Sequence, residues 1–476
     1  MASAPEQPHT TLGAAEQPHT TLGAAEPAPR DGDRTRRHLA VLTLAALAVR
    51  VAFLLTEPAT RLVGDEHTWT DWARMFASPR VGFSPFRNHE VFYPPLYAYF
   101  LSALVGLTGS FEAAKWAQVA VGALAIPAIG RVGARAFSPR VGLWAAAVAA
   151  LYLEMIWFSV HFWSETVFLT LLWWAIERLL KAEEERRAGL AVAAGALWGL
   201  AVLTRETVFY FLPFAAAWLA VRAGRGGARR AGAFLLTSVL VVAPWSYRNW
   251  RVFGAFVPVS TSGGQNLFQG NTRIPRDETY EMVHAVKGKI EQYRYAMRMG
   301  LEAIRDRQPW WILEKLRDEM PLFWEADSLV LVHIKRGAYG AVPPAAAVAV
   351  ALVVLAPYVA LLGLFVIGLT RLRPTKPAVL LVGFLAYYNL IHVVTHGFAR
   401  YRLPVMPVVF LVAGVGWAAW RAGELARMSG RARLVAAAMA LTFAVILIPS
   451  FRLNLEHPAF GFADTGGSPG EDAPSP

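Results

Sequence analysis

Residues 94–107 read PPLYAYFLSALVGL, and whether this stretch crosses a membrane decides the fold. It is apolar, but it is shorter than the roughly 20 residues that a membrane-spanning helix needs. Eleven further apolar runs approach or reach that length, and we expect each to span: 39–56, 113–130, 140–158, 164–181, 189–204, 206–222, 231–246, 344–370, 377–395, 403–420 and 433–450. If 94–107 spanned as well, every later connection would change sides.

The distribution of arginine and lysine decides against a span at 94–107. Cytoplasmic loops of membrane proteins carry an excess of these residues. With a cytoplasmic N-terminus and no span at 94–107, the basic connections all fall on the cytoplasmic side: 131–140, 178–187, 222–230, 371–376 and 421–433. The short connections on the other side carry Arg205, Arg400 and Arg402. The sequence therefore predicts an external C-terminus and, at 94–107, a helix in or on the outer leaflet.

The composition is typical of an all-α polytopic membrane protein. Hydrophobic residues make up 55% of the 476 and charged residues 17%, against about 25% charged residues in soluble domains. The net charge of +12 is concentrated in the predicted cytoplasmic loops, so it does not indicate a nucleic-acid partner. The absence of cysteine excludes disulfides, thiolate metal sites and cysteine nucleophiles.

We expect five parts along the chain. They are a disordered cytoplasmic tail at 1–37, a transmembrane module at 38–246 with an external loop at 57–112, an external loop or small domain at 247–343, a second transmembrane module at 344–450, and a disordered external tail at 451–476. The first tail contains the decapeptide EQPHTTLGAA twice in tandem, a sequence without an apolar face.

The two external segments contain helical patterns. Trp69, Trp72 and Phe76 fall on one face of a helix, which predicts an amphipathic helix at the membrane interface. In the second segment, residues 278–305 and 309–324 also have helical patterns. They predict a small external helical region. The stretch 254–275, rich in Pro, Gly, Ser and Thr, is predicted to be a loop.

Acidic residues near the external face are the first candidates for chemistry, because polar residues near a membrane mark functional positions. Asp65 and Glu66 follow the first span. Asp65 is either a general base or the N-cap of the following helix. A metal site formed by Asp65, Glu66 and His67 is disfavoured, because adjacent residues on one backbone seldom all point at one ion. We therefore predict no metal ligand and no certain cofactor, and a divalent metal stays open as an alternative that nothing in the sequence supports.

Further charged residues are predicted to share that face. Glu165 opens a span, either as a second carboxylate of the same cavity or as an acid favoured by the helix dipole. Arg205 either binds a phosphate group or pairs with Glu206. Arg400 and Arg402 lie on the predicted external side, where basic residues are disfavoured. Two reasons would explain them there: they bind phosphate, or they reach lipid headgroups.

Glycines and amides between 263 and 271 either hydrogen-bond a sugar or form a plain turn. No nucleotide-binding fingerprint occurs in a suitable context, so an enzyme that uses a soluble nucleotide sugar is not indicated.

The candidate segments described above, taken in their order along the chain, resemble the bacterial membrane glycosyltransferases related to protein O-mannosyltransferases and to the lipid A aminoarabinose transferase. The resemblance covers about 38–450. It is carried by Asp65-Glu66, Tyr93-Pro94-Pro95-Leu96, Ser164-Glu165, Leu203-Thr204-Arg205-Glu206, Pro244-Trp245 with Arg248-Asn249-Trp250, Gly264-Gln265-Asn266 with Gly270-Asn271, and Arg400-Tyr401-Arg402-Leu403-Pro404. The family has the GT-C fold, in which many spans carry horizontal helices in a first external loop.

The resemblance implies a glycosyltransferase of the bacterial inner membrane, with 38–246 as its catalytic module. It implies transfer of a sugar, with inversion, from a polyprenyl-phosphate donor to a lipid, glycan or protein acceptor at the outer face. Asp65 matches the family's catalytic acid, with Glu66 beside it, and Glu165 matches a second acid. The residues implied at the donor phosphate are Arg205, Arg400, Tyr401 and Arg402, and those implied at the substrate are Tyr93, Arg248, Asn249, Gln265, Asn266 and Asn271. Tyr93 is a departure, because relatives often have His or Lys there.

Two other functions remain open from the sequence. A secondary transporter places ionisable residues at mid-membrane on broken helices, often in repeated halves. A non-catalytic membrane component of a cell-envelope complex is the other alternative.

Overall fold

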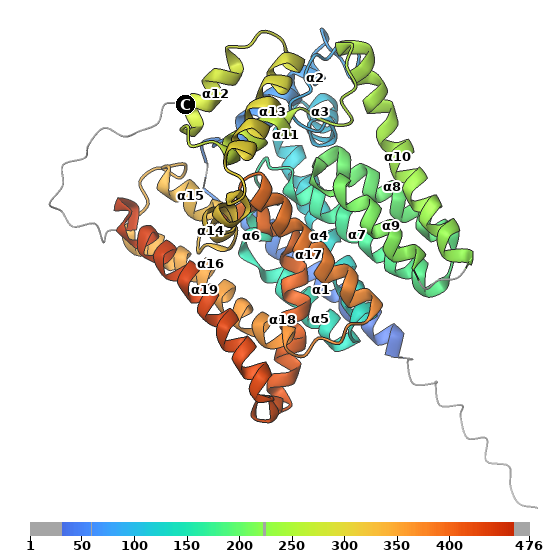
Figure 1. The fold of residues 1–476 in the computed structure, drawn as a ribbon, viewed down its shortest axis with the longest axis vertical. Coiled ribbons are helices and arrows are strands. Elements are labelled where there is room, and N and C mark those ends of the chain that lie inside the picture. The colour runs from blue at the N-terminus through green and yellow to red at the C-terminus, as the bar shows by residue number, and fades with distance from the viewer. Residues whose placement is uncertain (1–30, 59, 222–224, 461–476) are drawn as a thin grey trace, which may run out of the picture.

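The computed structural model describes residues 31–58, 60–221 and 225–460, and all regular structure within those ranges is helical. Long helices form the body of the molecule, and shorter helices gather at one end of it (Figure 1). The tandem decapeptide lies outside the described residues.

The N-terminal part of the chain supplies most of the body and two of the shorter helices. The helices are α1 (Asp31–Thr56), α2 (Asp65–Ala77), α3 (Leu96–Thr108), α4 (Phe111–Ala136), α5 (Pro139–Leu151), α6 (Leu153–Trp157), α7 (Glu165–Glu185), α8 (Ala188–Thr204), the 3-10 helix η1 (Glu206–Phe211), α9 (Leu212–Ala220) and α10 (Arg225–Phe253).

The C-terminal part begins with short helices and ends with long ones. The helices are α11 (Ser262–Asn271), α12 (Arg276–His284), α13 (Lys289–Asp306), α14 (Trp311–Trp324), α15 (Leu329–Lys335), α16 (Pro344–Leu369), α17 (Lys376–Val394), η2 (Ala399–Val405), α18 (Met406–Arg421), η3 (Glu424–Arg427), α19 (Gly430–Glu456) and η4 (Pro458–Phe460).

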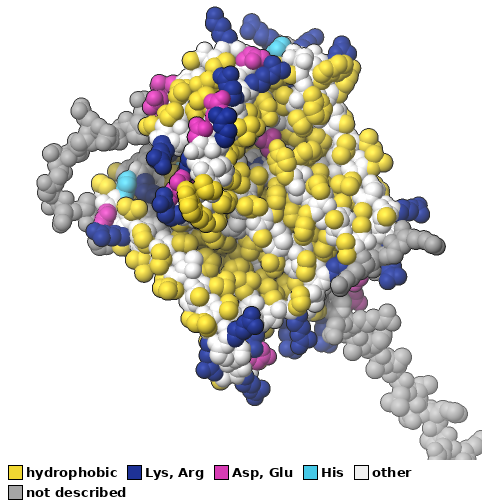
Figure 2. Space-filling view, viewed as in Figure 1, with side chains coloured by type: hydrophobic (Ala, Val, Ile, Leu, Met, Phe, Trp, Pro, Cys, Tyr) yellow, Lys and Arg dark blue, Asp and Glu magenta, His cyan; other side chains and the backbone are white. Residues whose placement is uncertain are grey.

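The polytopic all-α architecture is confirmed. Among the described residues, seven segments are long and apolar enough to cross a membrane: α1, α4, α10, α16, α17, η2 with α18, and α19. The remaining predicted runs coincide with α5 and α6, α7, α8, and η1 with α9. Apolar side chains cover the middle of the visible face, while lysines and arginines gather toward its ends (Figure 2). An exposed apolar belt between charged ends is the surface that a lipid bilayer requires.

Small residues let neighbouring long helices touch. A Cβ atom on Gly142 of α5 would lie 2.2 Å from the carbonyl oxygen of Gly130 in α4. Between α16 and α18, Cβ atoms on Gly368 and Gly416 would each lie 2.0 Å from a carbonyl oxygen of the facing helix. These backbones approach too closely for any side chain, which is a common way for helices to pack within a membrane.

The stretch 94–107 contains most of the short helix α3, which lies against α2 at the end of the molecule that also carries α11–α13 (Figure 1). Trp69 and Phe76 of α2 are buried in one apolar cluster with Tyr97 and Leu101 of α3. The predicted apolar face of α2 is therefore present, but it packs on protein rather than on lipid.

The predicted boundaries differ from the structure in three places. Helix α1 begins at Asp31, so residues 31–37 are helical rather than tail, because a spanning helix continues beyond the apolar run. The predicted loop 254–275 contains α11, whose weak helix formers are held by packing on α13. At the C-terminus, α19 and η4 extend the ordered chain through 451–460.

We expect the cavity end, defined as the end that carries α2, α3 and α11–α13, to face the cell exterior. Reporter fusions after Arg187, Arg230 and Arg373 are expected to report cytoplasm, and a fusion at Thr279 is expected to report the exterior, because the basic loops set the orientation. A cytoplasmic signal at Thr279 would invert this topology.

Candidate functional site

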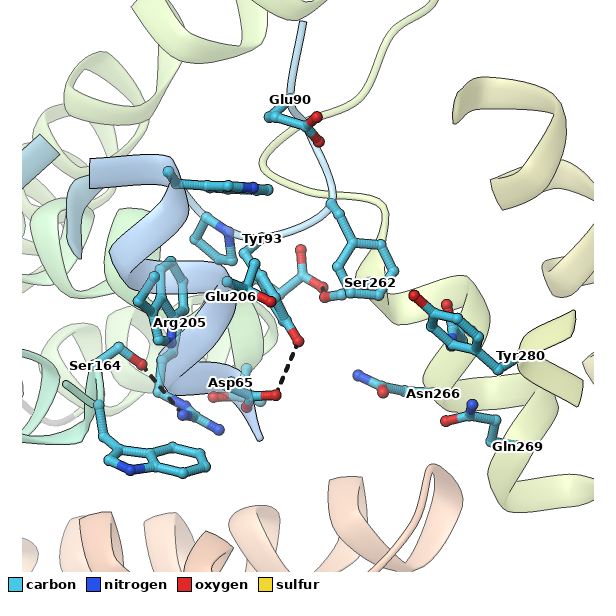
Figure 3. Close-up of a pocket in the computed structure, with 18 of the residues that line it drawn as sticks. Asp65, Glu90, Tyr93, Ser164, Arg205, Glu206, Ser262, Asn266, Gln269 and Tyr280 are labelled. Atoms are coloured by element: carbon cyan, nitrogen blue, oxygen red, sulfur yellow. Dashed lines mark hydrogen bonds between the residues drawn. The ribbon is translucent and has the colours of Figure 1, made fainter. Parts of the chain in front are cut away.

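A cavity of about 480 Å³ opens at the cavity end (Figure 3). Its walls come from the start of α2, the loop before α3, the starts of α7 and η1, helices α11–α13 and η2. Its polar and aromatic lining includes Asp65, Trp69, Trp72, Glu90, Tyr93, Trp163, Ser164, Glu165, Arg205, Glu206, Gln265, Asn266, Gln269, Tyr280, Arg400 and Tyr401. Segments distant in sequence thus place acids, bases and amides around one space.

Asp65 is the first residue of α2 and follows Gly64, whose φ of 61° favours glycine. Its side chain does not cap the helix. Instead, Oδ1 accepts a hydrogen bond from the Tyr93 hydroxyl at 3.2 Å, and Oδ2 accepts one from Arg400 Nη1 at 3.0 Å. The side chain remains 28% exposed. Of the two alternatives for Asp65, the structure favours a carboxylate in the cavity over an N-cap.

Glu165 and Arg205 form a second pair of opposite charges in the cavity. Arg205 Nη1 donates to Glu165 Oε1 at 2.7 Å and to the Ser164 hydroxyl at 3.3 Å (Figure 3 shows the latter bond). Glu165 is 1% exposed, so this partner neutralises a buried carboxylate. Only Nη1 of Arg205 is engaged in these bonds, and a guanidinium has further N–H groups to offer a ligand.

Glu206 does not pair with Arg205, although that pair was one of the two alternatives. Its carboxylate accepts hydrogen bonds from the hydroxyls of Ser260 at 2.7 Å and Ser262 at 3.1 Å. Glu206 therefore joins η1 to the segment that leads into α11.

Two of the cavity arginines lie around one aromatic ring. The guanidinium carbons of Arg400 and Arg205 lie 5.0 Å and 5.7 Å from the centre of the Tyr401 ring. Arg400 also lies 4.9 Å from the Trp163 ring, and its Nη2 donates to the Tyr401 hydroxyl at 3.2 Å. Packing on rings fixes the planes of both guanidiniums, so two cations and two carboxylates have defined positions in one cavity.

Glu66 points away from the cavity, although Asp65 beside it points in. Its carboxylate accepts hydrogen bonds from the main-chain N–H groups of Val63 and Phe162, both at 3.1 Å, and lies 3.2 Å from His333 Nε2. Burial alone would raise the pKa of Glu66, but the hydrogen bond to His333 and the adjacent charges hold this pKa below its usual value. Glu66 therefore fixes the start of α2, and the structure does not place it as a second base.

We expect Glu66→Gln to destabilise the protein by about 1–3 kcal/mol, because the amide NH2 group would face a main-chain N–H donor that loses its acceptor. Glu112→Gln is the matched control, since the Glu112 side chain is 66% exposed, and it is expected to stay within about 0.5 kcal/mol. Thermal unfolding of the purified proteins measures both. Equal stability of the two variants would show that the buried contacts of Glu66 contribute nothing.

Arg402 also lies outside the cavity, although the resemblance implied a role at the donor phosphate. It is 1% exposed, and its guanidinium donates to main-chain carbonyls in the segment 323–327. The guanidinium carbon lies 4.2 Å from the Tyr358 ring centre. Arg402 thus ties η2 to the end of α14, and no part of it is presented to a cavity ligand.

Three of the residues that the resemblance implied at the substrate form hydrogen bonds to main-chain carbonyls instead. Arg248 donates to main-chain carbonyls of the 85–90 loop. Asn249 donates to the carbonyls of 257 and 259, and Asn271 donates to main-chain carbonyls of α11 and α17. These side chains shape the walls of the cavity without lining it.

The outer rim of the cavity was not predicted. Asp277, Tyr280 and His284 of α12 and Lys289 and Gln292 of α13 line it. The sequence showed helical patterns here, but nothing in it indicated which side of each helix faces the cavity.

The three residues considered for a metal site do not converge. Asp65 faces the cavity, Glu66 is buried behind it, and the His67 ring bonds to the Leu62 carbonyl. Within 31–58, 60–221 and 225–460, no group of three or more His, Asp or Glu side chains is arranged to hold an ion. Among the cavity acids, Asp65 and Glu165 are each paired with an arginine.

Comparison with known proteins finds one family that part of the sequence matches and several structures that share the fold. Residues 93–248 match the family of dolichyl-phosphate-mannose-protein mannosyltransferases. The structure is similar to the oligosaccharyltransferase AglB of Archaeoglobus fulgidus, solved with an inhibitory peptide and a dolichol-phosphate, with a TM-score of 0.50 and 16% identity. The chain has the fold of the GT-C glycosyltransferases. The similarity covers 90% of this chain and 56% of AglB, so the chain spans little more than half of AglB's length.

A further GT-C structure with some similarity is ArnT of Cupriavidus metallidurans, solved with undecaprenyl phosphate, at a TM-score of 0.39 and 15% identity over 83% of this chain and 79% of ArnT. No curated protein matches the sequence. Of the cavity residues of this GT-C chain, Tyr93, Glu165 and Arg205 lie within the family match at 93–248, whereas Asp65 and Arg400 lie outside it.

Proposed function

We propose that this GT-C chain is a glycosyltransferase of the inner membrane. In this proposal it moves a sugar from a polyprenyl-phosphate carrier to an envelope acceptor, which is a lipid, a glycan or a protein, at the outer face of the membrane. A donor carried by the membrane removes the need for a nucleotide-binding domain.

The observation that carries the proposal is the pairing of carboxylates with guanidiniums in one cavity. Asp65 with Arg400 and Glu165 with Arg205 meet there, at 3.0 Å and 2.7 Å. Planar guanidinium groups suit phosphate oxygens, and an ionised carboxylate suits the removal of a proton from a hydroxyl or amine. The charges gather at one end of the bundle rather than halfway along it, which favours an enzyme over a transporter.

In the proposed reaction, Asp65 takes the proton of the acceptor nucleophile. The nucleophile forms a new bond to the anomeric carbon while the bond from that carbon to the phosphate oxygen breaks. The electron pair leaves with the phosphate, whose growing negative charge is stabilised by Arg205, with Arg400 beside it. Attack from the face opposite the phosphate inverts the configuration, and Asp65 then releases its proton to water.

Tyr93 and Glu165 have supporting roles in this scheme. The Tyr93 hydroxyl donates to Asp65, which orients the carboxylate. Glu165 holds Arg205 in place from a buried position and does not itself need to move a proton. No step requires a metal ion.

The direct biochemical test uses the purified protein in vesicles with polyprenyl-phosphate-linked sugars and a lipid extract of the cell envelope. We expect free polyprenyl phosphate to appear together with a new glycosylated product. Uptake of a labelled solute into the same vesicles, without any product, would instead identify a transporter.

A further inference from the structure

One element of the cavity wall opposite Asp65 is uncharged. It is formed by α11, and the segment 260–272 that contains this helix reads STSGGQNLFQGNT, without an acidic or basic residue. Three amides of α11 line the cavity: Gln265, Asn266 and Gln269. Figure 3 shows Asn266 and Gln269 extending across the cavity toward Asp65 and Tyr93. The wall at α2, α7 and η2 therefore carries the two carboxylate–guanidinium pairs, and α11 facing it carries neutral donors and acceptors, with further charged residues of α12 and α13 at the outer rim.

The amides of α11 are free to bind a ligand. Gln265 is 6% exposed, and its Oε1 has no hydrogen-bond partner among the described residues. Buried polar groups in folded proteins are almost always hydrogen-bonded, because leaving one unpaired is costly. A row of amides that lines a cavity, with one of them buried and unpaired, is therefore the arrangement expected where a ligand supplies the missing partner.

The helix that carries these amides is held rigidly. A Cβ atom on Gly264 would lie 2.8 Å from the Tyr293 ring of α13, and one on Gly270 would lie 1.6 Å from the Thr395 carbonyl oxygen. The Asn271 side chain donates to the carbonyl of the last residue of α17 and accepts from an indole N–H of α14. Side chains on so tightly packed a helix are positioned before the ligand arrives, which limits the entropy lost on binding.

We propose that Gln265, Asn266 and Gln269 form the subsite for the donor sugar and that this sugar is a neutral pyranose. The inference rests on the proposed function, because the phosphate at Arg205 and the anomeric carbon near Asp65 direct the hydroxyls of the ring toward α11. Amides donate to and accept from hydroxyl groups. An amino sugar or a uronic acid needs an opposite charge, and α11 supplies none, whereas Arg276, Asp277 and Lys289 belong to the outer rim on α12 and α13. The two oxygens of the neighbouring Glu206 are already taken by Ser260 and Ser262.

The test compares three lipids on the purified full-length protein: bare polyprenyl phosphate, the same lipid carrying a neutral hexose, and the same lipid carrying aminoarabinose. We expect the hexosyl lipid to bind about 10-fold more tightly than the bare lipid phosphate, since several hydrogen bonds are added. The double variant Asn266→Ala with Gln269→Ala is expected to remove this gain and to leave the affinity for bare lipid phosphate unchanged. Gln308→Ala, an exposed amide outside the cavity, is the matched control and is expected to behave as wild type.

The outcomes separate the subsite from the function. Three results would each contradict the neutral-sugar subsite and leave lipid-phosphate recognition intact. The hexosyl lipid binds no more tightly than the bare lipid, or the aminoarabinosyl lipid binds more tightly than the hexosyl lipid. The third is that the double variant keeps the gain in affinity. If bare polyprenyl phosphate does not bind at all, the proposed function fails, and the subsite fails with it. A Gln269→Glu variant that acquires a preference for the aminoarabinosyl lipid would support the placement of the sugar ring against α11.

Discussion

Asp65→Asn is expected to reduce sugar transfer by roughly 10²- to 10⁴-fold, the usual contribution of a general base. Asparagine has nearly the same shape, and it can still accept a hydrogen bond from Tyr93 or Arg400. It cannot take a proton from the acceptor. The measurement is the turnover of polyprenyl-phosphate-linked sugar by the reconstituted protein.

Asp71→Asn is the matched control for this prediction. Asp71 lies on the same helix, its side chain is 69% exposed, and it pairs with Arg74 at 3.1 Å. Its replacement is expected to leave turnover near the wild-type value. Binding of bare polyprenyl phosphate is expected to persist in both variants. Near-normal turnover of Asp65→Asn would remove Asp65 as the base, and Glu165 would be the next carboxylate to test.

Arg205→Lys is expected to weaken the binding of polyprenyl phosphate by roughly 10- to 150-fold, equivalent to about 1.5–3 kcal/mol for a lost charge-assisted hydrogen bond. Lysine keeps the positive charge beside Glu165, so the buried carboxylate remains paired and the fold is preserved. It lacks the planar fork that contacts Glu165 and a phosphate oxygen at the same time. The measurement is the equilibrium affinity for the bare lipid phosphate.

Two arginine variants are the controls for this second prediction. Arg61 is exposed and lies in the 57–112 loop that also carries Asp65, so the lipid affinity of Arg61→Lys is expected to match the wild type. Arg402→Lys is expected to lower thermal stability, because the main-chain carbonyls at 323–327 lose donors. If Arg205→Lys binds lipid phosphate as well as Arg61→Lys does, Arg205 has only a structural role toward Glu165.

The large-scale arrangement was predictable because it depends on patterns that extend over many residues. The eleven apolar runs coincide with helices, and the stretch 94–107, which the basic loops excluded from the predicted spans, contains the short helix α3. Helix α11 was not predictable in this way. Its glycines and amides are weak helix formers, and only the contacts with α13 and with the turn after α17 make it helical.

The sequence indicated segments that the structure brings around one cavity, but it did not separate the residues within each segment. Neighbours in an α-helix point about 100° apart, so Asp65 faces the cavity while Glu66 faces His333. In the 3-10 helix η2, residues two apart point about 240° apart, so Arg400 enters the cavity and Arg402 does not. Which of two neighbours faces inward depends on the rotation of the helix, and that rotation is set by tertiary packing.

The most direct test of the central claim is mass spectrometry of envelope glycans, glycolipids and glycoproteins from a strain that lacks this gene. The account predicts that at least one envelope molecule loses the mass of a single sugar residue, that its polyprenyl-phosphate-linked donor accumulates, and that the wild-type gene restores the sugar while an Asp65→Asn gene does not. An envelope of unchanged mass in the deletion strain, or full restoration by the Asp65→Asn gene, would contradict it.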